Sequence, residues 1–290
     1  DFCLSRGLGD VYKRQELILH PMVEDSKEAT GSMGDDTPVA VLSSHFRPLS
    51  HYFRQNFSQV TNPPIDSLRE YKVMSLKTRF GNLGNILDFD NLTEETIYVL
   101  DSPILSNSQI KKFKKLFASK IRTIDCTFKT TETLKEGLEK IKNDAEISVR
   151  EGSTTLVLSD KNIGATRANI PMVLAVGAIN SHLVNLGLRG YCSINVETSE
   201  TLDTHSFAVL IGVGATTINP YLTIDSIFQR FEKKLFGELS FNDCVLRFKK
   251  SIENGLLKIM SKMGISVTVS YTHLRAHETG RNLVCRLLLE

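Results

Sequence analysis

Strand-like and helix-like segments alternate through the second half of the chain, and this alternation restricts the fold more than any other feature of the sequence. Short runs rich in β-branched and apolar residues occupy 121–128, 155–158, 191–197 and 216–219. Between and after them, apolar residues repeat at helical spacing over 134–149, 171–185, 203–211 and 224–235. Strands that alternate with helices at this spacing form parallel βαβ units.

Four such units are too few to close an eight-stranded barrel within this half of the chain. The sequence therefore predicts an α/β fold whose parallel βαβ units form a barrel-like or open sheet. In the first half of the chain, the sequence predicts helices over 45–60 and 67–77. A corner at two consecutive prolines separates them, because proline fixes φ and lacks a backbone donor. We expect this N-terminal helical and loop portion to pack against the sheet.

Three polar residues, Asp160, Glu197 and Asn219, stand at the ends of predicted strands. Because α/β proteins usually bind ligands at the carboxyl ends of their strands, an active site here would make the chain a self-standing β/α-barrel-like enzyme. The other interpretation is that these residues cap helices and bond loop backbones. We favour it because no partner base, metal-ligand set or phosphate-binding sequence accompanies them. The sequence thus predicts no catalytic, cofactor-binding or metal-binding residue.

The charge balance excludes several classes of partner. The chain has 35 basic and 33 acidic residues, so it has no general basic field for nucleic acid or anionic lipid. A run of lysines over 111–115 is interpreted as a solvated helix face. The longest apolar stretches are about half the length that crosses a bilayer. We expect a cytoplasmic protein that binds neither nucleic acid nor a membrane.

Cysteine spacing argues against a zinc site, a redox pair or a disulfide framework. The 5 cysteines are scattered, and no two of them form a Cys-x-x-Cys pair. We expect reduced, mostly buried thiols.

The two ends of the chain differ from its interior. Residues 1–15 and 268–290 lack a sustained helical or strand period, and both resemble translated sequencing-adaptor read-through. They are predicted to be an artefactual leader and an artefactual tail, and they are left out of the fold prediction.

Three segments of the interior resemble one family. The sequences GSMGDDTPVAVLS over 31–43 and YFRQNFSQVTNPPIDSLRE over 52–70 resemble the opening of the glutamate synthase central domain. The sequence GLLKIMSKMGIS over 255–266 is similar to the passage of that family into its flavin-binding domain. The resemblance predicts a central domain over 16–240 and the start of the FMN-binding synthase domain over 241–267.

The resemblance implies a fragment of a multidomain oxidoreductase. In that family an N-terminal glutaminase releases ammonia, and a domain with FMN and an iron–sulfur cluster converts 2-oxoglutarate and ammonia into glutamate. The electrons come from ferredoxin or from an NAD(P)H-linked subunit. The central domain connects the two sites, packs against both neighbouring domains and helps to wall the ammonia passage. This fragment is expected to hold no cofactor, to be inactive alone, and to come from the cytoplasm or, in a photosynthetic eukaryote, a plastid.

Two loops are the expected contact points with the neighbouring domains. Small residues let backbones approach closely, and an amide side chain can bond a neighbouring segment. The interdomain and ammonia-channel candidates are Gly31, Ser32, Met33, Gly34, Thr61, Asn62, Pro63 and Pro64.

Overall fold

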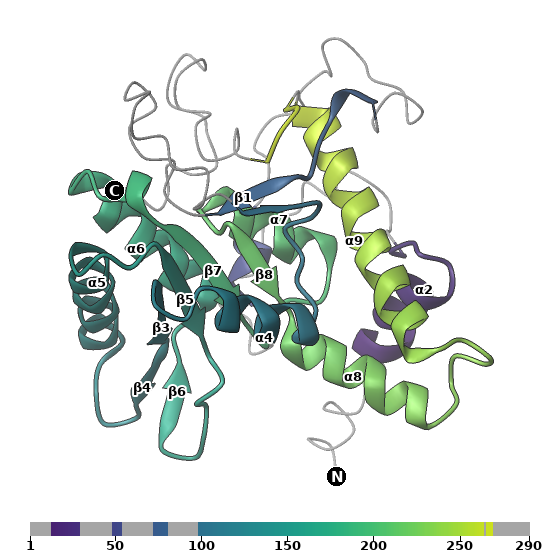
Figure 1. Cartoon of the computed structure of the whole chain (residues 1–290). Helices are drawn as coiled ribbons and strands as arrows, with labels where there is room; N and C mark the ends of the chain where they lie inside the picture. Colours follow the sequence, from purple (N-terminus) through teal and green to yellow (C-terminus); the bar gives the residue numbers. More distant parts are fainter. Residues whose placement is uncertain (1–12, 30–47, 54–71, 81–97, 264, 269–290) are drawn as a thin grey trace.

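A computed structural model describes residues 13–29, 48–53, 72–80, 98–263 and 265–268 (Figure 1). At its centre, four parallel strands alternate with helices, as the sequence predicts for an α/β fold. The strands are β3 (Ile121–Asp125), β5 (Thr155–Ser159), β7 (Ser193–Glu197) and β8 (Thr217–Asn219). The helices of this unit are α5 (Leu134–Arg150), α6 (Met172–Asn185), α7 (Thr204–Gly212) and α8 (Tyr221–Glu232).

The sheet is open, with the order β3-β5-β7-β8. Its register pairs Val157 with Asn195, and Asn195 with Thr217. A short extended segment continues the sheet beyond β8, because the Leu105 amide donates to the Ile218 carbonyl at 2.9 Å and the Ile218 amide donates to the Pro103 carbonyl at 2.8 Å. Of the two predicted forms, barrel-like or open, the described residues therefore form the open sheet.

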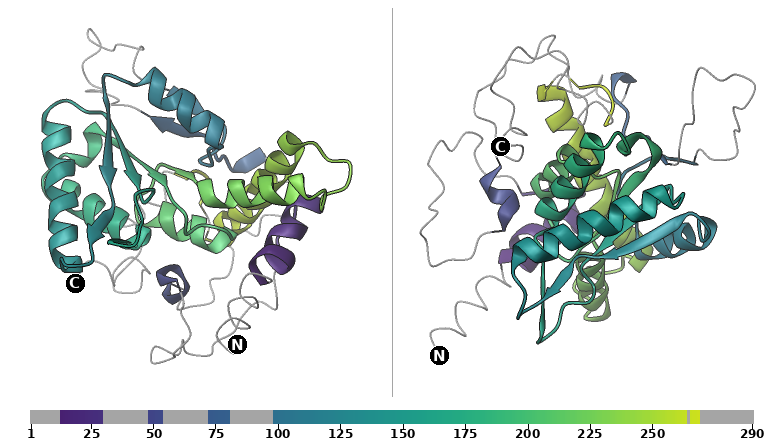
Figure 2. Two further views of the ribbon diagram at one scale, coloured as in Figure 1. Left: turned by 90° about the horizontal axis from the view of Figure 1, so that it is seen from below. Right: turned by 90° about the vertical axis from the view of Figure 1, so that its left-hand side faces the viewer.

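The two faces of the sheet pack against different layers. Alternate residues of a strand point to opposite faces, so Leu156 and Leu158 enter the large core beneath α5, α6 and α7. Val157 points the other way and packs with Ile110 and Phe113 of α4 (Asn107–Leu116). In Figure 1, α4 crosses in front of the strands, and Figure 2 shows the same arrangement from two further sides.

Helix boundaries follow local capping signals. The Ser106 hydroxyl accepts from the Gln109 amide at 3.2 Å, and the Gln109 side chain accepts from the Ser106 amide at 2.9 Å, which forms a capping box for α4. Thr133 and Glu136 form the same motif for α5. After α5, Gly152 has a φ of +95°, a left-handed conformation that glycine adopts at low cost. These signals explain why the predicted limits of α5, 134–149, agree closely with the structure.

The N-terminal segment packs against the last helix, α9 (Phe241–Met263). Residues 13–24 form a π-helical turn, η1 (Lys13–Leu19), and a short helix, α2 (His20–Glu24), which lies beside α9 in Figures 1 and 2. Met22 and Val23 are buried there. In α9, buried residues repeat every four positions and join the same core; they are Cys244, Phe248, Ile252, Leu256 and Met260.

Six smaller elements complete the described fold. They are η2 (Leu49–Tyr52), η4 (Arg189–Tyr191), the antiparallel pair β1 (Thr78–Phe80) and β2 (Tyr98–Leu100), and the antiparallel pair β4 (Thr127–Lys129) and β6 (Arg167–Asn169). Among the described residues, no helix is both long and apolar enough to span a membrane.

Three sequence predictions need correction. The helix predicted over 45–60 is not continuous, since the described residues 48–53 contain a single 3-10 turn, η2, flanked by extended Pro48 and Phe53. Proline lacks the amide that a helix interior needs. The helix predicted over 67–77 does not reach its predicted end, because Ser75 makes a parallel bridge to Val267. The strand predicted over 121–128 breaks at Cys126, between β3 and β4.

Candidate functional site

The carboxyl end of the sheet brings together the three polar residues that the sequence marked. Glu197 ends β7, Asn219 ends β8, and Asp160 follows β5, and all three are buried. Their backbones are joined directly: the Asp160 amide donates to the Glu197 carbonyl at 3.3 Å, and the Thr198 amide donates to the Asn219 carbonyl at 3.0 Å. The prediction that they share one edge of the sheet is confirmed.

Glu197 is held between two lysines from different segments. Its side chain is 2% exposed; one oxygen accepts from Lys114 Nζ at 2.6 Å and the other from Lys161 Nζ at 2.8 Å. Burial alone would raise the pKa of Glu197, but the hydrogen bonds and charges of the two lysines outweigh burial and leave the pKa below its usual value. The ion pair between Lys114 of α4 and Glu197 holds α4 over the end of β7.

Replacing Glu197 with glutamine is expected to lower the free energy of unfolding by about 2 kcal/mol at pH 7, because charge-assisted hydrogen bonds are lost. The folded-state pKa of Glu197 is lowered, so its contribution is present above the unfolded pKa of about 4.3 and is lost as pH falls through the folded value. The difference between wild type and variant should therefore shrink below about pH 4 in urea titrations. Glu139→Gln, which removes only a surface pair with Lys142, is the control and should change stability far less.

Asp160 organises the loop that follows β7. One carboxylate oxygen, Oδ2, accepts three hydrogen bonds: from Thr198 Oγ1 at 3.0 Å, from the Ser199 amide at 2.8 Å and from Ser199 Oγ at 3.0 Å. Burial and the nearby charge of Asp160 raise the pKa of Tyr221, which keeps that phenol neutral. The carboxylate thus ties the ends of two strands together.

Glu200 is a third acidic residue of this region, which sequence reasoning did not select. Its carboxylate accepts from Asn169 Nδ2 at 2.6 Å and from the Met172 amide, at the start of α6, at 3.0 Å. Burial is the main cause that raises the pKa of Glu200, and the charge of Asp160 raises it further. The partners are 31 and 28 residues away in the chain, so no local pattern indicated this role.

Asn219 connects β8 to the start of α4. Its Nδ2 donates to the Leu105 carbonyl at 2.9 Å and to Asn107 Oδ1 at 3.0 Å. Asn107 Nδ2 in turn donates to Asp225 Oδ1 at 3.0 Å. Asn219 therefore fixes a loop backbone, the role that the sequence analysis favoured for all three strand-end residues.

The contacts of these residues hold strands, loops and α4 together. Each of the three sequence-marked side chains is engaged with a lysine, a hydroxyl, an amide or a carbonyl of the protein. In the part of the chain that the structure describes, no three His, Cys, Asp or Glu residues are grouped as a metal site. The described cysteines Cys126, Cys192 and Cys244 are buried, and burial raises the pKa of each thiol. Neutral buried thiols are poor nucleophiles and poor metal ligands.

Comparison with known proteins identifies the family. A family model of the glutamate synthase central domain matches residues 8–279. The large chain of glutamate synthase [NADPH] from Azospirillum brasilense is 52% identical over 270 residues, which are 92% of this chain and 18% of that protein. The chain belongs to the glutamate synthase central domain family. The resemblance found in the sequence is thereby confirmed, and the alternative of a self-standing enzyme is not favoured.

Two further relatives come from other organisms. The glutamate synthase [NADPH] large chain of Bacillus subtilis is 39% identical over 92% of this chain and 17% of that protein. The ferredoxin-dependent glutamate synthase of Pyropia yezoensis is 38% identical over 92% of this chain and 18% of that protein. The chain thus spans less than a fifth of the length of these relatives.

A solved structure of the flavin-binding domain of baker's yeast flavocytochrome b2 is similar over 65% of this chain and 44% of that one, with a TM-score of 0.35 and 15% identity. A likeness at this level has no bearing on the fold or function of the central domain.

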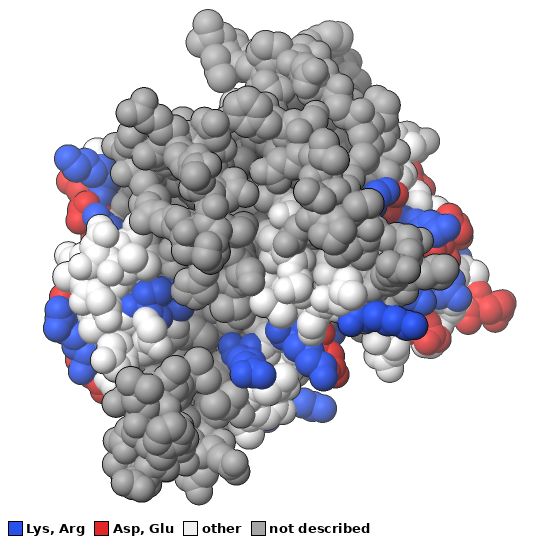
Figure 3. Space-filling view, turned by 90° about the horizontal axis from the view of Figure 1, so that it is seen from above, with Lys and Arg blue, Asp and Glu red and all other residues white. Residues whose placement is uncertain are grey.

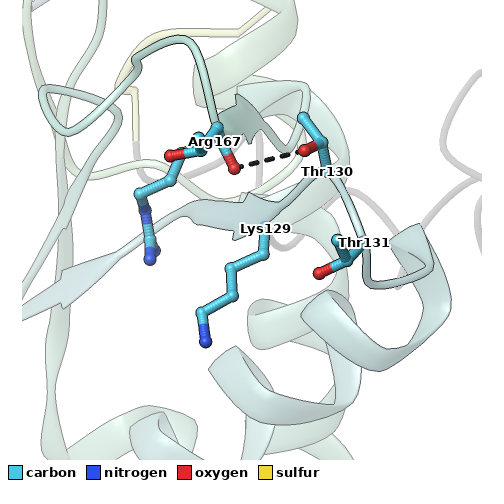
Figure 4. A pocket seen from close by; sticks show the side chains of 5 residues that line it. Lys129, Thr130, Thr131 and Arg167 are labelled. Atoms are coloured by element: carbon cyan, nitrogen blue, oxygen red, sulfur yellow. Dashed lines mark hydrogen bonds between the residues drawn. The ribbon is translucent and has the colours of Figure 1, made fainter.

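The central domain also has a surface pocket that the sequence did not indicate. It lies at the β4–β6 pair (Figure 4) and is lined by Lys129, Thr130, Thr131, Thr166 and Arg167. The Arg167 guanidinium is already bound, since Nη2 donates to Asp125 Oδ2 and to the Thr127 carbonyl, both at 2.9 Å. Because the lining residues come from two segments, no single motif predicts the pocket.

The interdomain candidates of the central domain lie outside the described residues. This holds for the first loop, Gly31, Ser32, Met33 and Gly34, and for the second loop, Thr61, Asn62, Pro63 and Pro64. Their assignment remains a sequence prediction.

Proposed function

We propose that this chain is the central, connecting segment of a glutamate synthase large chain. That enzyme converts glutamine, 2-oxoglutarate and reductant into two molecules of glutamate. The observation that carries the proposal is the 52% identity to the Azospirillum brasilense large chain, which extends over 92% of this chain but only 18% of the relative. A segment with this coverage corresponds to one part of a longer enzyme.

The strand-end geometry supports a connecting role. Asp160, Glu197 and Asn219 are engaged within the protein, so they stabilise the sheet end and the loops around it. A rigid unit of this kind can hold two neighbouring active sites at a fixed separation, which preserves the alignment that multistep catalysis needs. The glutaminase and FMN-binding domains of the same polypeptide are its partners in this proposal.

The cofactors of the parent enzyme belong to other domains in this proposal. An iron–sulfur cluster requires several cysteine thiolates. The described cysteines are dispersed, buried and protonated, so the described part of the chain does not suit such a cluster. We assign FMN and the cluster to the neighbouring synthase domain. The electron donor is ferredoxin or an NAD(P)H-linked subunit, since the names of the relatives include both types. The compartment is the cytoplasm, or a plastid as for the chloroplastic relative from Spinacia oleracea.

The DNA on both sides of this segment tests the proposal directly. The same reading frame is expected to encode a glutaminase before it and a flavin-binding barrel after it. In-frame stop codons close to both ends of residues 16–267, in DNA cloned from the source, would contradict the proposal.

The two candidate loops give a functional test in the intact enzyme. Thr61→Phe or Gly34→Phe is expected to reduce glutamine-dependent glutamate synthesis by roughly tenfold, about 1.4 kcal/mol in activation free energy, while ammonia-dependent synthesis changes much less. The reason is that a bulky side chain in a passage wall blocks ammonia from the glutaminase but not ammonia from solution. Thr131→Phe, on an exposed turn, is the control. Equal loss of both activities would show that these loops do not line the passage.

A further inference from the structure

The solvent-facing side of α4 carries an unusual distribution of charge. From residue 102 to residue 124 the chain has six basic residues and no acidic one, although the whole chain is nearly balanced. Lys111, Lys112 and Lys115 are exposed, opposite the buried Ile110 and Phe113. Residues three and four apart are neighbours on a helix, so these lysines repel one another.

Helix α5, another helix with a solvent-exposed face, has a different arrangement of charge. On α5, Glu139 pairs with Lys142 at 2.7 Å and Glu146 pairs with Arg150 at 2.8 Å, which balances charge along the helix. On α4, only Lys114 has an ion-pair partner among the described residues, Glu197. The positive charges of the other three lysines are therefore not compensated by the described part of the chain.

Exposed apolar side chains lie next to these lysines. Leu116 is 62% exposed and follows Lys112 by one helical turn, so both lie on the same face of α4. Tyr98, 44% exposed, contacts Phe117 at the end of α4, with ring centroids 6.0 Å apart. Its neighbour in β2, Val99, is 50% exposed. We call this surface the α4 patch, defined by Tyr98, Val99, Lys111, Lys112, Lys115 and Leu116.

A central apolar group with a charged rim is the usual anatomy of a protein interface. We propose that the α4 patch docks an acidic, apolar-centred face of another domain of the same large chain. The charge of the patch selects an acidic surface, and the exposed leucine, valine and tyrosine favour a protein face over a nucleic acid backbone. The inference rests on the proposed function, because this chain spans only 18% of its relative and the remaining length supplies the partner.

Figure 3 shows the molecule from above. On the described part of that face, several Lys and Arg side chains stand in the lower middle of the view, with uncharged side chains and one acidic group beside them, and other Asp and Glu side chains stand toward the two sides.

Lysine labelling in the intact large chain tests the docking. Lys135 and Lys140 of α5 are exposed like Lys111, Lys112 and Lys115, and they serve as internal controls in the same sample. An amine-acylating reagent is expected to label the three α4 lysines at least roughly tenfold more slowly than the two controls, because a docked domain covers them. Comparable rates would overturn the proposal.

A zero-length carbodiimide cross-linker identifies the docked domain, since it joins a lysine amine to a carboxylate that contacts this amine. The expected partners are Asp or Glu residues of the same chain that lie outside this segment. A cross-link to the acidic residues of 88–95 within this chain, or a product of doubled mass, would overturn the proposal in favour of self-covering or of a second copy.

A charge-reversed variant tests whether the docking depends on the lysine charges. In Lys111→Glu/Lys115→Glu, labelling of Lys112 is expected to rise to the control rate, whereas Lys135→Glu/Lys140→Glu should leave it slow. Lys112 labelling that is unchanged in the α4 variant would count against a charge-dependent dock. Glutamine-dependent synthesis measured on the same wild-type preparation tests the proposed function separately, because labelling rates do not depend on turnover.

Discussion

Gly214→Ala is expected to lower the free energy of unfolding of this chain by about 3 kcal/mol, for two reasons that add at one position. Gly214 has a φ of +121°, which side chains rarely adopt. A Cβ there would also lie 2.6 Å from Cγ and Oδ1 of Asn180, closer than real contacts allow. Asn180 has little freedom to move, because its Oδ1 accepts from Arg189 Nε at 2.8 Å.

The same substitution disturbs a wider set of hydrogen bonds. The Arg189 guanidinium donates to the Gly214 carbonyl at 3.0 Å and to the Cys192 carbonyl at 2.6 Å, so it joins the end of α7 to the start of β7. A shift of Asn180 or of the Gly214 backbone weakens this junction. Urea unfolding monitored by circular dichroism measures the loss.

Two other glycines separate the causes. Gly152 and Gly187 also have positive φ, but an added Cβ at either position meets no atom within 4 Å. Their alanine variants should each lose only about 1 kcal/mol, the cost of the backbone conformation. If Gly214→Ala were no more destabilising than these two, the predicted clash with Asn180 would be wrong.

Asp160→Ala is expected to cost about 3 kcal/mol of unfolding free energy. The substitution removes the acceptor of three hydrogen bonds. Three donors then lose their partner: the Thr198 hydroxyl, the Ser199 amide and the Ser199 hydroxyl. Each buried donor left without a partner costs about 1 to 3 kcal/mol, reduced where solvent reaches it. Asp144→Ala, at an exposed position of α5, is the control and should change stability by less than about 0.5 kcal/mol.

The sign of this effect also distinguishes the two interpretations of the strand-end residues. A carboxylate kept for catalysis is often held at a cost to stability, so its removal can stabilise the protein. Removal of a carboxylate that accepts three hydrogen bonds from the loop after a neighbouring strand should only destabilise the protein. A more stable Asp160→Ala variant would therefore favour the self-standing enzyme over the connecting segment.

Local patterns predicted the regular elements well where each element determines its own limits. Helix α5 follows from apolar spacing, from the Thr133–Glu136 capping box and from Gly152 after its end. The strands of the sheet follow from short apolar runs between such helices. These features depend on neighbours within a few residues, so a single sequence carries them.

The failures have specific physical causes. The strand predicted over 121–128 breaks because the Asp125 carboxylate accepts from the Thr127 amide at 3.0 Å and from Arg167 at 2.9 Å, which draws the chain into the separate β4–β6 pair. Helix α9 was not predicted, although its buried residues repeat at helical spacing.

The sequence by itself determined the family, the alternation of parallel strands and helices, and the position of three polar residues at one edge of the sheet. Only the tertiary structure decided what those residues do. Glu197 meets Lys114, which is 83 residues away, and Lys161, which is 36 residues away. Periodicity and capping are local properties, whereas the partner of a buried charge is chosen by the packing of distant segments.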